Sequence, residues 1–227
     1  MTGSTAMRRL GPPPPSGTGT AAMVELSAPA PSAARDEPSA IAPPTDFQVV
    51  PLAGLSVVGL VIAGLVATIV TNRLWAIDFY HVVSGAMWTT LDLFLGFVLG
   101  PILGRMSVPA RAELARRLMP KMVLIMPTLV VCTLAGGWQL ARHVGYLDAS
   151  YSHHGWVVAS LIVVAVMAVV ALGVLEPANI AVLVELRQPD PDGEVIGRLM
   201  RRFIYSAGIT GAMQIATLVI MTRLATT

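Results

Sequence analysis

Residues 82–104 read VVSGAMWTTLDLFLGFVLGPILG, an apolar stretch with one carboxylate, Asp92, near its middle. A helix needs about 20 apolar residues to span a bilayer core, so this stretch is long enough to do so. Hydrocarbon offers no water to a charge, and a central Asp costs about 2.5–3.5 kcal/mol on insertion scales. We therefore expect Asp92 to face the interior of a helical bundle or to stay protonated.

Polar and small residues recur around Asp92 at helical spacing. At about 100° per residue they fall on one stripe, while most apolar residues of the segment lie elsewhere. One face of this helix is thus expected to carry an imidazole, an indole and two carboxylates. The stripe comprises Asp78, His81, Gly85, Trp88, Asp92 and Gly96.

The composition places the chain among polytopic membrane proteins. Of its 227 residues, 55% are hydrophobic and only 12% are charged, which is too apolar for a soluble domain of this length. Five apolar segments of membrane-spanning length predict an all-α transmembrane bundle over residues 47–227. We place its helices near residues 49–71, 76–104, 119–141, 156–184 and 202–224.

The first 46 residues have a different composition. They are rich in Pro, Ala, Ser, Thr and Gly and contain no apolar periodic segment. This composition predicts a disordered tail over residues 1–46 that forms no core. Leu10 is followed by Gly and four prolines where a signal peptide needs its apolar region, so we expect no cleaved signal.

Basic residues gather in two of the loops and predict the orientation of the chain. Cytoplasmic loops carry an excess of Lys and Arg, so the N-terminus is expected in the cytoplasm and the C-terminus outside. The orientation of the chain in the membrane accounts for these basic residues, so we expect no nucleic-acid partner. We expect contact with the lipid bilayer, with further copies of the chain or with subunits of a membrane complex. The two basic clusters are Arg105, Arg111, Arg116, Arg117 and Lys121, and then Arg187, Arg198, Arg201 and Arg202.

All four histidines map to the outer side in this topology. His81 lies in the outer part of the second helix, and His143, His153 and His154 lie in or beside the loop between the third and fourth helices. Imidazole is a common ligand of metals and haem iron, so this set is a candidate metal site. Polar and aromatic residues are also ordinary at a membrane interface without any ligand.

Other ionisable and polar residues are expected inside the bundle. Lys121 shares a face with Thr128 and Cys132, and Ser206, Thr210 and Thr217 share another with Gln214 close by. The candidate partners of Asp92 at similar depth are Thr128, Cys132, Thr210 and Gln214. For Glu176, an ion pair with Lys121 or with the arginines of the cytoplasmic loops is preferred to a role in proton transfer.

The segment His81-Val-Val-Ser-Gly-Ala-Met-Trp88 resembles a helix signature of bacterial membrane proteins related to copper resistance protein D and to the HemJ type of protoporphyrinogen oxidase. The similarity extends over about residues 76–184. It includes Arg116-Arg117 before a helix that ends Leu134-Ala-Gly-Gly137, and Gly155 at the start of the following helix. The resemblance implies a helical bundle in the bacterial inner membrane. It also implies that His81 is an axial ligand of haem b or part of a copper site, with Trp88 beside the cofactor.

Three classes of function remain open from the sequence. The first is a haem- or metal-binding membrane protein, with His81 as one ligand and an outer histidine or Met87 as the second. The second is a proton- or ion-coupled transporter that uses Asp92, and the third is an accessory or assembly subunit of a membrane complex. The sequence lacks GxSxG, HExxH, Walker and dinucleotide motifs, so no catalytic residue is predicted.

Overall fold

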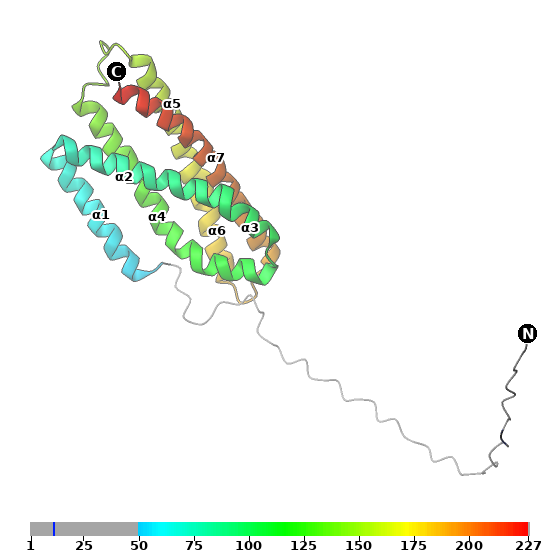
Figure 1. The fold of residues 1–227 in the computed structure, drawn as a ribbon. Helices are drawn as coiled ribbons and strands as arrows, with labels where there is room; N and C mark the ends of the chain where they lie inside the picture. Colours follow the sequence, from blue (N-terminus) through cyan, green and yellow to red (C-terminus); the bar gives the residue numbers. More distant parts are fainter. Residues whose placement is uncertain (1–10, 12–49, 227) are drawn as a thin grey trace, which may run out of the picture. The chain divides into compact units, whose positions relative to one another are not determined.

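A computed structural model describes Gly11 and residues 50–226. Apart from Gly11, the tail predicted over residues 1–46 lies outside the described residues. Residues 50–226 lie within one compact unit, and they form helices and turns without a strand (Figure 1). The prediction of an all-α protein is confirmed.

Five helical segments are long and apolar enough to cross a membrane, as predicted, so the chain has the architecture of an integral membrane protein. Two of them change geometry along their length, because a π-helical segment joins two α-helices. In chain order the elements are α1 (Leu52–Thr71), α2 (Leu74–Leu93), η1 (Phe94–Leu99), α3 (Gly100–Arg105), α4 (Val108–His143), α5 (His154–Val170), η2 (Ala171–Leu175), α6 (Glu176–Leu186) and α7 (Gly193–Ala225), where η1 and η2 are the π-helical segments.

Two helices begin well before the apolar segments that predicted them. α4 begins at Val108 instead of near residue 119, and α7 begins at Gly193 instead of near residue 202. Proline suits the first turn of a helix, and Pro109 occupies it in α4. In α7, the carboxylate of Asp192 caps the helix by accepting a backbone N–H at 2.7 Å. Hydropathy identifies only the part of a helix that crosses the hydrocarbon. It therefore did not predict the polar first turns of α4 and α7.

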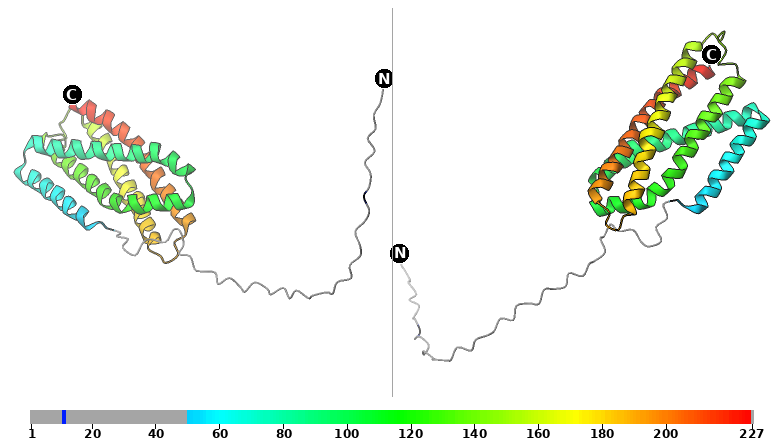
Figure 2. Two further views of the ribbon diagram at one scale, coloured as in Figure 1. Left: turned by 60° about the horizontal axis from the view of Figure 1, so that its bottom comes forward. Right: turned by 180° about the vertical axis from the view of Figure 1, so that it is seen from behind.

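α4 and α7 are the central helices of the bundle. α4 packs against α1, α2, α6 and α7, and α7 packs against α2, α5, α6 and both π-helical segments. α1 lies at the margin, beside α2 and α4 (Figure 2), and only its Leu65 and Thr68 are buried. The buried face of α2, which includes Trp88 and Asp92, is turned toward α4 and α7.

Glycines let the backbone of α2 and η1 touch the backbone of α7. A Cβ atom built on Gly96 would lie 2.3 Å from the Cα of Gly208, and one built on Gly211 would lie 3.1 Å from the backbone nitrogen of Leu93. Small residues permit this kind of close approach between membrane helices. The glycine contact holds the residues just before η1, including Asp92, against α7.

The glycine contact is asymmetric, and this predicts unequal effects of two alanine substitutions. Gly96→Ala must push the helices apart, so it should destabilise the protein by about 1–3 kcal/mol, as overpacking does. Gly208→Ala places its Cβ at an ordinary 3.4 Å from Gly96, so its stability should stay within about 1 kcal/mol of the parent. Thermal unfolding in detergent, followed by tryptophan fluorescence, measures both. Equal destabilisation by the two variants would contradict this account of the contact.

Candidate functional site

Asp92 is completely buried between α2 and α7, at 0% exposure. Its Oδ2 accepts a hydrogen bond from the Thr210 hydroxyl at 2.8 Å and another from the Gln214 side-chain amide at 3.1 Å. Two of the four predicted partners are thereby confirmed. Thr128 instead donates its hydroxyl to the backbone carbonyl of Leu124 at 2.7 Å. The fifth spanning helix, and not the third, supplies the donors.

The partners of Asp92 are uncharged. Within residues 50–226, ion pairs join Glu113 to Arg116 and Arg117, and none reaches Asp92. An adjacent cation would hold a carboxylate in its ionised form. Among the described residues, no ion pair holds the Asp92 carboxyl group in its ionised form.

Both partners of Asp92 can donate or accept a hydrogen bond. The Thr210 hydroxyl lies 2.8 Å from Asp92 and 3.0 Å from each of the Ser206 and Ala207 carbonyl oxygens. Its one proton can point to the carboxylate or to the backbone, and in the second case its oxygen is free to accept. The Oε1 of Gln214 has no hydrogen-bond partner among the described residues. The site can therefore hold Asp92 in either protonation state without moving a helix.

Trp88 lies one helical turn before Asp92 and is 1% exposed. Its indole interacts with the Asp92 side chain, but its Nε1 and the Asp92 Oδ1 make no well-formed hydrogen bond with described residues. Trp88 is therefore a third uncharged neighbour of the Asp92 carboxyl group, deep inside the bundle.

A π-helical segment adjoins each of the two carboxylates that lie within the apolar parts of the spans. η1 follows Asp92 after one residue, and η2 ends at the residue before Glu176. Short π-helical segments inside α-helices occur frequently at functional sites. The sequence contains no signal that we recognised for either segment, so this feature of the site was missed.

Glu176 and Lys121 differ from the sequence predictions. Lys121 is exposed on α4, so its predicted burial is wrong; a long basic side chain turns outward so that its ammonium reaches water at the interface. Glu176 is partly buried and forms no ion pair with a described residue, so the predicted pairing with Lys121 or the arginines is also wrong. Glu176 interacts with Asn179, which is completely buried although its amide makes no well-formed hydrogen bond with described residues. Asn179 was missed because its depth depends on the packing of α6 against α4 and α7.

His81 is fixed against a pair of glycines on α4. Its Nδ1 donates to the backbone carbonyl of Thr133 at 2.9 Å, because a carbonyl oxygen can only accept. A Cβ built on Gly137 would lie 2.7 Å from the imidazole, so only glycine leaves room for the ring at this position. Histidines that ligate metals commonly donate their other ring N–H to a carbonyl in this way, which leaves Nε2 as the ligating atom. Nε2 forms no hydrogen bond with a described residue.

The other histidines are placed separately. The ring of His143 lies 3.2 Å from the Asn72 side chain, His153 lies 3.1 Å from the Ser152 hydroxyl, and His154 is exposed at the start of α5. Among the described residues, no three His, Cys, Asp or Glu side chains gather into a group that can hold a metal ion. The predicted set of four histidines is therefore not brought together. Met87 is half exposed on α2.

Comparison of the chain with models of protein families, with curated proteins and with solved structures gave no match. The resemblance of the His81–Trp88 segment stays a prediction.

A double-mutant cycle tests the Asp92–Thr210 hydrogen bond. Thr210→Val removes one donor from a buried acceptor and should destabilise the protein by about 1 kcal/mol. In an Asp92→Leu background the same change should have little effect, because its partner is already gone. Thr128→Val is the matched control, since that hydroxyl bonds only within its own helix. The measurement is thermal unfolding in detergent, and an equal effect of Thr210→Val in both backgrounds would rule out the bond.

Proposed function

We propose that this integral membrane protein works by reversible protonation of Asp92, as a proton-coupled or proton-conducting carrier. The observation that supports the proposal is a completely buried carboxylate held by two uncharged side chains, each able to donate or accept. Ionisable residues inside membrane helices commonly mark ion pathways and proton relays. The π-helical segments beside Asp92 and Glu176 add support, because such segments recur at functional sites.

A purely structural role for Asp92 is the competing account. A permanently protonated carboxyl could tie α2 to α7 by the same hydrogen bonds. The two accounts differ in whether the proton leaves, because a tie between helices keeps one protonation state at all working pH values. The test must therefore detect the proton itself before it measures transport.

Infrared difference spectroscopy of the purified protein detects that proton directly. The C=O stretching band of a protonated carboxylic acid should fall as the pH is raised from about pH 5 to about pH 9. Asp92→Asn should remove this band, and Asp78→Asn should keep it, because Asp78 is an exposed carboxylate on the same helix. An Asp92 band that is constant across this range would contradict reversible protonation.

Transport is tested in proteoliposomes that contain a pH-sensitive dye. A potassium diffusion potential set by valinomycin should drive proton entry through the parent protein, and Asp92→Asn should reduce the rate at least about tenfold. A neutral side chain of the same shape cannot carry the proton. Asp78→Asn is again the control and should transport like the parent. Parent-like flux in Asp92→Asn would exclude the proposed role.

A second candidate is cofactor binding by His81, as the resemblance implies. It is favoured by the Nδ1 hydrogen bond to the Thr133 carbonyl, which presents Nε2 as a ligand atom. This arrangement of the two ring nitrogens suits His81 to be an axial ligand of haem or a ligand of copper. The second ligand would come from an outer histidine, from Met87, which is half exposed on α2, or from a partner chain.

Absorption spectra of the detergent-purified protein test this candidate. If haem is bound, His81→Ala should abolish the Soret band in both the oxidised and the reduced sample, because it removes the iron ligand. His153→Ala should keep the band, because the neighbouring His154 can take its place as the outer ligand. Metal analysis on the same samples distinguishes copper from haem iron. A Soret band unchanged in His81→Ala would exclude this residue as the ligand.

We further propose that the chain resides in a bacterial cytoplasmic membrane with its N-terminus in the cytoplasm. The support is the gathering of arginines around the starts of α4 and α7, at one end of the bundle.

A further inference from the structure

A hollow lined by arginines lies where α4 and α7 begin. Its volume is about 330 Å³, and its charged lining consists of Arg111 from α4 with Glu194, Arg198 and Arg201 from α7. Three guanidinium groups face one carboxylate, so the lining carries a net positive charge. We refer to this space as the arginine hollow. Its size lies within the range of small-ligand sites.

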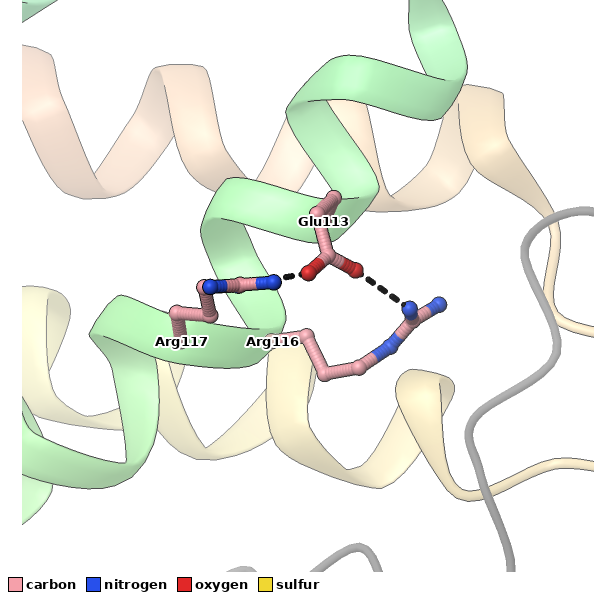
Figure 3. Close-up of polar contacts among 3 residues, drawn as sticks. All are labelled: Glu113, Arg116 and Arg117. Carbon is pink, nitrogen blue, oxygen red and sulfur yellow. Dashed lines mark hydrogen bonds and ion pairs between the residues drawn. The ribbon is translucent and has the colours of Figure 1, made fainter.

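The arginines of the hollow lack counter-ions in the described part of the chain. Their neighbours on α4 are paired, because Glu113 lies 2.6 Å from Arg116 and 2.5 Å from Arg117 (Figure 3). No ion pair joins the arginines of the hollow to any described residue. Unpaired guanidinium groups at a membrane surface are suited to a phosphate, which they bind in bidentate geometry.

The start of α4 adds to the positive character of the hollow. Val108, the first residue of α4, lines it, and Ser107 before it makes no capping hydrogen bond through its side chain. The backbone N–H groups at the start of a helix favour an anion. Arg111 is held in place by a hydrogen bond from its Nε to the Met106 carbonyl at 3.1 Å. The Arg111 guanidinium and the start of α4 therefore both favour an anion in the arginine hollow.

An apolar groove continues from the arginine hollow into the membrane-spanning part. A second space of about 330 Å³ shares Arg111 and Arg201 with the hollow and runs between α3 and α7 past Gly104, Ile204 and Tyr205. Tyr205 is 70% exposed, so the groove opens on the outer surface of the bundle. A charged compartment joined to an apolar one fits a ligand with an anionic head and a hydrocarbon chain.

We propose that this site binds an anionic phospholipid, with the phosphate between Arg111, Arg198 and Arg201 and one acyl chain along the groove between α3 and α7. Basic pockets between membrane helices bind anionic headgroups on the same physical grounds. The net positive lining selects an anionic lipid over a zwitterionic one. The apolar groove selects a lipid over free phosphate, because a small anion leaves it unfilled.

Lipid titration of the full chain in detergent tests the proposal, with the rise in unfolding temperature as the readout. Dioleoyl phosphatidylglycerol should stabilise the parent, whereas dioleoyl phosphatidylcholine and inorganic phosphate at the same concentrations should not. Arg201→Gln should weaken the apparent affinity for phosphatidylglycerol about tenfold, because it removes a charge-assisted contact. Arg202→Gln is the matched control and should bind like the parent, since the neighbouring arginine does not line the site.

A steric variant tests the groove separately from charge. A Cβ on Gly104 meets nothing within 4 Å, so Gly104→Leu should fold normally while it fills the space for the acyl chain and weakens binding. Gly59→Leu on α1, also in open space, is its control. If Arg202→Gln and Arg201→Gln lost the same affinity for phosphatidylglycerol, the effect would come from surface charge in general. That result would overturn the proposed site. Stabilisation by inorganic phosphate alone, or undiminished binding in Gly104→Leu, would overturn the assignment to a lipid.

Discussion

The burial of one carboxylate in an apolar bundle constrains the arrangement of α2 and α7. Asp92 cannot remain at this depth without hydrogen-bond partners, because hydrocarbon supplies none. Thr210 and Gln214 supply them from α7. The bonds require close helices, and the contact between Gly96 and Gly208 brings the backbones together just beyond Asp92. Polar pairing and glycine packing thus depend on each other at this crossing.

The site around Asp92 combines rigid packing with adaptable hydrogen bonds. The helices cannot shift without separating the glycine contact, but the Thr210 hydroxyl can rotate among three acceptors. In such a site a change of protonation state requires only small movements of hydrogen atoms. Proton transfer is therefore compatible with a bundle that stays packed, and the π-helical segments η1 and η2 mark the places where the helices themselves depart from regular geometry.

The two ends of the bundle have different chemistry. Near one end, His81 rests on the glycine pair of α4 with one ring nitrogen fixed by a carbonyl. At the other end, polar turns of α4 and α7 extend beyond the apolar spans and carry the arginines that line a groove. Asp92 lies between these ends, about 16 Å along the helix from His81 at 1.5 Å per residue. Asp92, His81 and the proposed lipid site are therefore separate features that single substitutions can examine one at a time.

The sequence by itself determined the five spans, the burial of Trp88 and Asp92 on one helix face, and the candidate partners Thr210 and Gln214. Hydropathy and helical periodicity are local properties, so a single chain segment reveals them. Only the tertiary structure decided that Thr210 pairs with Asp92 while Thr128 does not, that Lys121 is exposed, and that His81 lies against Gly137. It alone revealed the π-helical segments and the groove at the arginine hollow. These features depend on which helices adjoin and on how closely their backbones approach, and neither quantity is encoded in the periodicity of one segment.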